Sequence, residues 1–252
     1  MNPDRRWDRA ALGGAGLALF LIAWQIIGHY RLAGLTWPPL TDVAAQLADP
    51  NRWPLFGRAL SATLAATAAG YVVGLMFGLA GAILIHVWPV TRPGTDRLAA
   101  VINSIPSIAL APVFIVFLSR ESTPAAVAAV HVAFIIYVAA SSGLAAATRG
   151  HVDLLAVLGA SRAQRLWRLD LPASLPALAS GLKLAVPAAL IGAVIGEWFG
   201  APRGLGVLIV NAMQNFQIPL LWCSVALIAA SSLILYSLLG VLERACYSRF
   251  AT

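Results

Sequence analysis

The chain has 252 residues, of which 60% are hydrophobic and only 11% are charged. Its mean hydropathy of +0.83 excludes a soluble globular domain, which needs more polar surface to cover its core. The net charge of +7 could suit a nucleic-acid partner, but the basic residues stand at the ends of apolar runs, where they act as topology signals. We therefore expect a chain embedded in a lipid bilayer, with no nucleic acid bound.

Six apolar segments are each long enough to cross a hydrocarbon core of about 30 Å as a helix. They cover residues 11–29, 59–86, 98–118, 124–147, 177–199 and 218–241. The first segment follows a basic stretch, as in a signal peptide, but no convincing cleavage site follows it, so we expect an uncleaved first span. The sequence predicts an all-α membrane protein with a bundle of six transmembrane helices.

The arginines in the short connections predict the orientation of this bundle. One set of connections holds eleven arginines and the opposite set holds five. Because basic residues accumulate on the cytoplasmic side, we expect a multi-pass protein with both termini in the cytoplasm. The expected parts are a cytoplasmic segment and first span (1–30), an external loop (31–58), a core of five spans (59–245) that includes a cytoplasmic loop (149–176), and a cytoplasmic tail (246–252).

The external loop is too polar to span. Within it, Val43–Leu47 is predicted as a short interfacial helix capped by Thr41 or Asp42.

Two spans carry small residues at every fourth position, which places them on one helix face where another helix can approach closely. One ladder is Ala66, Gly70, Gly74, Gly78 and Ala82; the other is Ala188, Gly192, Gly196, Gly200 and Gly204. The spacing predicts tight helix packing. It does not distinguish contacts within one chain from contacts between two chains.

The third span contains two prolines and several polar residues, so we expect a kinked helix whose polar side chains satisfy the freed carbonyls. Such a helix could line a water-filled path or could serve packing alone. The candidate pathway residues are Asn103, Ser104 and Ser107. Polar residues near the predicted outer end of the sixth span could contact a partner or form an outer gate. These are Asn211, Gln214, Asn215 and Gln217.

Lys183 and Glu197 are the ionisable residues inside otherwise apolar segments, both in the fifth span. Lys183 could extend its ammonium to the interface, whereas either residue could instead couple transport to an ion gradient. They cannot pair with each other, since fourteen residues of helix separate them by about 21 Å. His131 is expected to be a packed or pore-facing polar residue.

The sequence lacks a phosphate-binding loop, an H-E-x-x-H motif and a G-x-S-x-G motif. We therefore expect a chain that is not an enzyme and binds no cofactor.

The loop at 149–176 is charged, although apolar segments flank it. Residues 151–158 have a helical apolar pattern, and Gly159 can end that helix in the left-handed conformation. Ser161 with Gln164 forms a capping-box pattern for a second helix over 162–169, which Pro172 and Pro176 are expected to end. This corner could dock on a cytoplasmic protein or rest on lipid headgroups.

The run DLLAVLGASRAQRLWRLDLPASLP (153–176) resembles the loop of ABC importer permeases, with its pattern of E-A-A, three residues, G, nine residues and I-x-L-P. Here Asp-Leu-Leu stands in place of Glu-Ala-Ala, while the spacing from Gly159 to Pro172 is kept. The segments LTWPPLTDVAAQL, SIPSIALAPVFIVFL and GLKLAVPAALIGAVIGEWFGAPRGLGVLI are similar to permeases of the nitrate/sulfonate/taurine branch, so the resemblance covers roughly residues 35–245.

This resemblance implies a type I importer permease fold with a cytoplasmic coupling helix, in a bacterial-type inner membrane. It implies a second permease copy, two cytoplasmic ATPase subunits that bind ATP and magnesium, and an external solute-binding protein. The substrate class would be a small polar solute, including anions such as sulfonate, taurine or nitrate. The residues expected to contact the ATPase are Asp153, Leu154, Leu155, Gly159, Ala160, Ser161 and Arg162. The alternatives are a secondary transporter driven by an ion gradient and a membrane scaffold subunit without a pathway.

Overall fold

A computed structural model describes the backbone of residues 4–250 and the side chains of residues 12–249. This description leaves out residues 1–3 of the expected cytoplasmic segment and residues 251–252 of the expected tail. It also leaves out the side chains of three arginines that were used to predict the orientation. Those arginines are Arg5, Arg6 and Arg9. Within the described residues the chain consists of helices and connections without strands, which confirms the all-α prediction.

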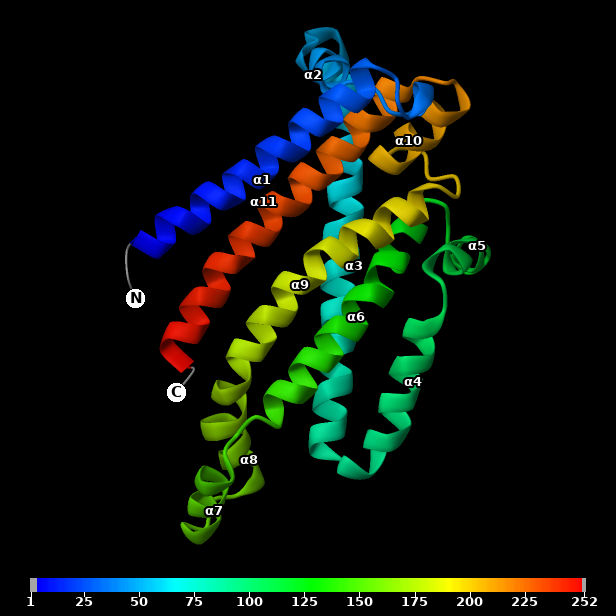
Figure 1. The fold of residues 1–252 in the computed structure, drawn as a ribbon. Coiled ribbons are helices and arrows are strands. Elements are labelled where there is room, and N and C mark those ends of the chain that lie inside the picture. The colour runs from blue at the N-terminus through cyan, green and yellow to red at the C-terminus, as the bar shows by residue number, and fades with distance from the viewer. Residues whose placement is uncertain (1–3, 251–252) are drawn as a thin grey trace.

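The helices follow one another with short connections (Figure 1). In chain order they are α1 (Asp4–His29), α2 (Leu40–Ala48), α3 (Trp53–Val87), α4 (Arg92–Ser104), α5 (Ser107–Phe117), α6 (Thr123–Leu144), α7 (Arg149–Val157), α8 (Arg162–Arg165), α9 (Leu171–Glu197), α10 (Leu205–Gln214) and α11 (Ile218–Phe250). A π-helical segment, Leu166–Asp170, joins α8 to α9, and single 3₁₀ turns lie at Gly34–Thr36, Pro50–Arg52 and Pro89–Thr91. One end of the molecule carries α2 and α10, and the opposite end carries α7 and α8.

Five of the described helices, α1, α3, α6, α9 and α11, are long and apolar enough to cross a membrane. The third predicted span differs, because it is two helices, α4 and α5, that meet at a bend of 97°. Pro106 has no N–H to continue the helix, and it forces Ile105 into the extended region, at ψ 125°. The sequence predicted a kink here, but the helix is broken. As expected, a nearby polar side chain satisfies a freed carbonyl, since the Ser104 hydroxyl donates to the Val101 carbonyl over 2.7 Å.

The core consists of α3, α6 and α9, and α6 packs closely on each of the other two. Its centre is formed by small and branched residues: Ala128, Val132, Ile136, Ala185, Ala189 and Ala193. The first glycine ladder lies directly on the α6 backbone. A Cβ on Gly70, Gly74 or Gly78 would meet the carbonyl oxygens of Ala125, Ala129 and Ala133 at 2.4–2.6 Å.

The second ladder packs on an adjacent face of α6. A Cβ on Gly192 would lie 2.8 Å from the Ala128 Cα, and one on Gly196 would lie 2.5 Å from the Pro124 Cα. Gly200 and Gly204 instead lie in the connection after α9, with φ angles of 97° and 152°. Both ladders therefore make contacts within one chain, which was open from the sequence.

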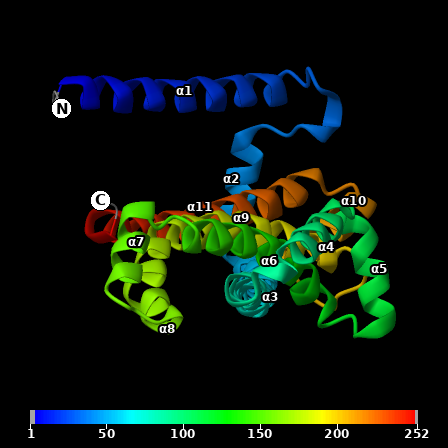
Figure 2. The same cartoon turned by 90° about the horizontal axis from the view of Figure 1, so that it is seen from below.

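Helix α1 stands apart from this core and joins it through α2 (Figure 2). Three indoles fix the junction between α1, the loop and α11: the Trp24 and Trp37 rings are 4.7 Å apart, and Trp222 lies 4.7 Å from Trp24 and 5.0 Å from Trp37. The Trp24 indole N–H donates to the Pro38 carbonyl, and that of Trp222 donates to the Thr36 carbonyl, each over 3.0 Å. Indoles suit this position because their ring is apolar and their N–H needs an acceptor.

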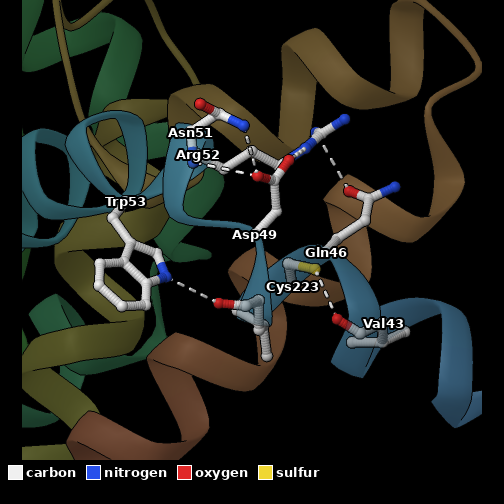
Figure 3. Close-up of polar contacts among 8 residues, drawn as sticks. Val43, Gln46, Asp49, Asn51, Arg52, Trp53 and Cys223 are labelled. Atoms are coloured by element: carbon white, nitrogen blue, oxygen red, sulfur yellow. Dashed lines mark hydrogen bonds and ion pairs between the residues drawn. The ribbon is translucent and has the colours of Figure 1, made fainter.

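The link from α2 to α3 is held by side chains bonded to backbone (Figure 3). Asp49 caps the 3₁₀ turn by accepting from the Asn51 N–H over 3.0 Å, and the Trp53 indole donates to the Leu47 carbonyl over 3.1 Å. Cys223 of α11 donates to the Val43 carbonyl over 3.4 Å, so α2 is fastened to the body.

The predicted cap of α2 is wrong. The helix begins at Leu40, so Thr41 and Asp42 lie inside its first turn, and Pro39 is the N-cap without a side-chain bond. The fixed φ of proline, here −63°, suits a helix start.

Candidate functional site

Helix α7 forms the first half of the charged loop and ends at Gly159, as predicted. Gly159 has a φ of 72°, its N–H donates to the Ala156 carbonyl over 3.1 Å, and the Ala160 N–H donates to the Leu155 carbonyl over 2.9 Å. This pair of bonds is the Schellman motif, which satisfies the last carbonyls of a helix and turns the chain sharply.

Helix α8 begins immediately after this turn. The Ser161 hydroxyl accepts from the Gln164 N–H over 3.2 Å, and the Gln164 side chain accepts from the Ser161 N–H over 2.9 Å. The predicted capping box is therefore confirmed. The corner between α7 and α8 is thus specified on both sides by local hydrogen bonds.

The predicted end of the second loop helix is wrong. Pro172 and Pro176 do not stop it, because α8 continues through the π-helical segment into α9 without a break. The Leu171 N–H bonds to the Leu166 carbonyl, five residues back, so the helical register has already shifted where Pro172 lacks its N–H. The loop therefore has an outer helix, α7, and an inner helix that is the direct extension of a membrane span.

The seven residues expected to contact the ATPase lie together at this corner. Asp153, Leu154, Gly159, Ser161 and Arg162 are exposed, and Leu155 and Ala160 are half-buried. Three apolar side chains nearby, Val157, Leu158 and Trp167, are 70–85% exposed. The apolar pattern of residues 151–158 included the first two, but sequence reasoning missed Trp167. Its signal was available, because large apolar residues in a charged loop indicate an interaction surface. The corner is a rigid protrusion with an exposed apolar face.

Removing the cap of α8 should loosen this corner. We expect Ser161→Ala to cost about 1 kcal/mol, because an orphan N–H loses its acceptor, and tryptic cleavage after Arg162 and Arg165 should become about fivefold faster. The measurement is the rate of each cleavage, followed by mass spectrometry. Ser161→Asp keeps an acceptor and serves as the control, so equal cleavage of the two variants would contradict the role of the cap.

The three pathway candidates surround the break between α4 and α5. Asn103 and Ser104 are exposed at the end of α4, and Ser107 is half-buried at the start of α5. The Ser107 hydroxyl lies 2.7 Å from Nε2 of His131, whose Nδ1 lies 2.9 Å from the Val127 carbonyl. Since a carbonyl only accepts, Nδ1 carries the proton, and in neutral histidine Nε2 accepts from Ser107. His131 is therefore a packed polar residue that fixes the start of α5.

A cavity of about 440 Å³ lies between α3, α4 and α6. Its walls are almost entirely apolar side chains; Thr95 and Tyr137 are the lining residues with polar side-chain groups. This lining does not suit a polar solute. The polar residues at the α4–α5 break are exposed at the surface of this single chain, and a pathway along them needs a second wall.

The four candidates for an outer gate, Asn211, Gln214, Asn215 and Gln217, are all exposed around the end of α10. The Asn215 side chain donates to the Asn211 carbonyl over 2.8 Å and ends the helix. Phe216, between them, is 87% exposed at a φ of 55°. Sequence reasoning missed this phenylalanine. It makes the tip of the connection partly apolar.

The two charges inside the fifth predicted span both have partners within the chain. The Lys183 Nζ lies 2.7 Å from the Glu243 carboxylate of α11 and over the Tyr236 ring, 4.5 Å from its centre. The Ser180 hydroxyl also donates to Glu243, over 2.7 Å. The pair joins α9 to α11.

Glu197 is 2% exposed and accepts from the Gly206 N–H over 2.7 Å, so it caps the start of α10. The hydroxyl of Thr63 in α3 accepts from the preceding N–H, that of Leu205, over 2.8 Å. The free N–H groups of a helix start favour a carboxylate.

These features define a class of protein: a multi-pass helical membrane protein with a broken span and a rigid loop that protrudes from the end of a membrane helix. A family model described as "binding-protein-dependent transport system inner membrane component" matches residues 70–250. The chain belongs to this family. It is a permease subunit of an ABC importer and an integral protein of the inner membrane, as the resemblance predicted.

Two relatives illustrate the range of this family. The formylaminopyrimidine transport permease protein ThiX of Halalkalibacterium halodurans is 30% identical over 225 residues, which cover 89% of this chain and 86% of the relative. The taurine transport system permease protein TauC of Escherichia coli is 25% identical over 254 residues, which cover 95% of this chain and 90% of the relative. The likeness to a taurine permease confirms the predicted branch.

The fold is shared with a solved structure. A chain of the MetNI methionine ABC transporter, in an inward-facing conformation, superposes with a TM-score of 0.71 at 19% identity and covers 79% of this chain and 99% of its own. The match confirms the predicted type I importer permease fold.

Proposed function

We propose that two copies of this chain form the pathway of an ATP-driven importer for a small polar solute. The solute would be delivered by an external binding protein, and ATP would be hydrolysed, with magnesium, in two separate cytoplasmic subunits that dock on the α7–α8 corner. The observation that carries this proposal is the corner itself, which is exposed, apolar at its tip and continuous with the membrane span α9.

The distribution of charge supports a cytoplasmic position for this corner. The end of the molecule that carries α7 and α8 also carries the turn between α3 and α4 (Figure 1). Six arginines lie at this end: Arg92, Arg97, Arg149, Arg162, Arg165 and Arg168. The positive-inside rule places such an end in the cytoplasm, where ATP is available. Both termini would then lie on the same side, as the sequence predicted.

A second copy of the chain is supported by the pathway candidates. Asn103 and Ser104 are exposed at the surface of the single chain, although α4 and α5 together are long and apolar enough for a membrane span. Polar side chains exposed to lipid are costly, so such residues normally face protein or water. A partner that covers them would supply the missing wall and leave a polar path between the two copies.

The proposed substrate class is supported by analogy with the relatives, whose names include formylaminopyrimidine and taurine. Both are small polar molecules. We propose a solute of this kind, with sulfonate, taurine and nitrate as the anionic candidates. A ligand screen by thermal shift on a solute-binding protein that binds this permease would identify it.

The test of this function is binding of the ATPase. Leu154→Asp places a charge in the exposed apolar face of α7. We expect this change to weaken co-purification of the partner ATPase at least about tenfold, because a buried unpaired charge costs more than 1.4 kcal/mol. Val90→Asp is the matched control, since Val90 is 87% exposed on the 3₁₀ turn after α3. Equal co-purification with Leu154→Asp and with the unchanged chain would reject docking at this corner.

A further inference from the structure

The junction between the loop and the membrane span contains a π-helical segment, Leu166–Asp170. A π-helical turn has weaker hydrogen-bond geometry than an α-helix and inserts a residue into the helical register. It is therefore the point at which the long helix formed by α8 and α9 would bend most easily. A movement imposed on α7 passes through this joint before it reaches α9.

Asp170 lies at the end of the joint and is 1% exposed. Its carboxylate is contacted by two side chains from different places in the fold. Nε of Arg165 lies 3.2 Å and 3.4 Å from the two carboxylate oxygens, and Nε2 of His86 lies 3.2 Å from one of them. Arg165 is the last residue of α8, so its contact crosses the joint. His86 is in the last turn of α3, so its contact ties the joint to a second membrane span.

Apolar packing surrounds this polar contact. Leu166 and Leu171, at the two ends of the joint, pack against a buried cluster from α3 and α6. The buried residues of that cluster are Ala82, Ile85, Tyr137, Ala140 and Leu144. A buried carboxylate with good partners fixes geometry more than it adds stability, since its removal from water costs about as much as its contacts return. The triad of Arg165, Asp170 and His86 is thus a device for orientation.

From this geometry we infer that Asp170 is a positioning residue for energy coupling: it stiffens the π-helical joint so that α8, α9 and the end of α3 move as one body. The inference rests on the proposed function, in which the ATPase moves the α7–α8 corner. Without Asp170, the corner would still bind the ATPase, because α7 is unchanged. The joint would then bend and the movement would not reach the spans.

The experiment measures the joint directly by spin-label distances in liposomes, on the permease alone and on its complex with the ATPase, with and without ATP. One label replaces Ala163, exposed on α8, and the other replaces Val90, exposed after α3, in a background with Cys223→Ala and Cys246→Ala. In the otherwise unchanged chain we expect one narrow distance distribution in every state. Asp170→Asn and His86→Ala are expected to lose this narrow peak while the amount of bound ATPase is unchanged.

Two further variants separate orientation from general stability. His86→Gln keeps a donor near the same place and is expected to retain the narrow peak. Arg92→Gln breaks an exposed pair with Asp96 (3.6 Å) at the same end of the molecule and serves as the second control. A narrow, unchanged distance distribution in both Asp170→Asn and His86→Ala would overturn the inference. If one of the two variants does not fold, the distance distribution of the other variant tests the inference. Absence of ATPase binding by the unchanged chain would reject the proposed function. The distances measured on the permease alone would still show whether Asp170 stiffens the π-helical joint.

Discussion

Replacement of Gly74 by alanine will destabilise the protein by about 1–3 kcal/mol, the usual cost of one surplus methyl group in a close-packed core. The added Cβ would lie 2.5 Å from the Ala129 carbonyl oxygen and 2.6 Å from the Val132 Cβ, closer than such atoms can approach. The backbone of α6 is also held on an adjacent face, because Gly192 of α9 packs against Ala128. Gly74→Leu is therefore expected not to accumulate as a monodisperse protein at all.

The matched control lies on the same helix. Gly57 of α3 is exposed, and a Cβ there would have no neighbour within 4 Å. Gly57→Ala should leave the stability unchanged or raise it by up to about 1 kcal/mol, because alanine favours the helix. The measurement is the temperature at which half of the protein in detergent remains monodisperse. Equal temperatures for Gly57→Ala and Gly74→Ala would mean that α3 does not pack on α6 as described.

The glycine ladders show how far the sequence could lead. Small residues at every fourth position predicted a close contact between helices, and α3 and α9 both make such a contact with α6. Periodicity identifies a face but not what covers it, so the choice between one chain and two came from the structure alone. The same limit applies to the second ladder, where Gly200 and Gly204 continue the spacing after the helix has ended.

Proline predicted the end of a helix correctly only where its effect depended on neighbouring residues alone. Pro106 does break the third span, because it restricts Ile105 directly. Pro172 does not end the loop helix, because a π-helical turn absorbs its missing N–H. That turn is held by Leu166, Leu171 and Asp170 against α3 and α6, which are distant in sequence. Local rules could not predict it.

The loop corner was predictable for the opposite reason. Gly159, Ser161 and Gln164 determine it through hydrogen bonds that span three to five residues. By contrast, Asp170, Lys183 and Glu197 each have a partner on another helix: His86, Glu243 and the Gly206 N–H, in that order. For Lys183 and Glu197, the signal that remained was that each charge is surrounded in sequence by apolar residues, which indicates a buried partner without identifying it.

Replacement of Glu197 by alanine should release α10 from the body of the protein. The change leaves the buried Gly206 N–H without an acceptor and empties the space under Gly204, whose added Cβ would lie 2.2 Å from the Glu197 carboxyl carbon. Loss of a hydrogen bond to a charged group costs about 1.5–3 kcal/mol. The expected result is a lower monodispersity midpoint in detergent and faster labelling of a cysteine placed at Gln214 by a maleimide.

Glu197→Gln separates this structural role from a role in ion coupling. Glutamine keeps an oxygen that can accept from Gly206, and it removes the cost of a buried charge whose second oxygen has no hydrogen-bond partner. If Glu197 acts as the cap of α10, the glutamine variant will match or exceed the stability of the unchanged chain and keep the ATP hydrolysis of its complex. An ion-coupled transporter would instead need a carboxyl group that can bind and release a cation. A glutamine variant as unstable as the alanine variant would show that the charge itself, and not the accepted hydrogen bond, holds α10 in place.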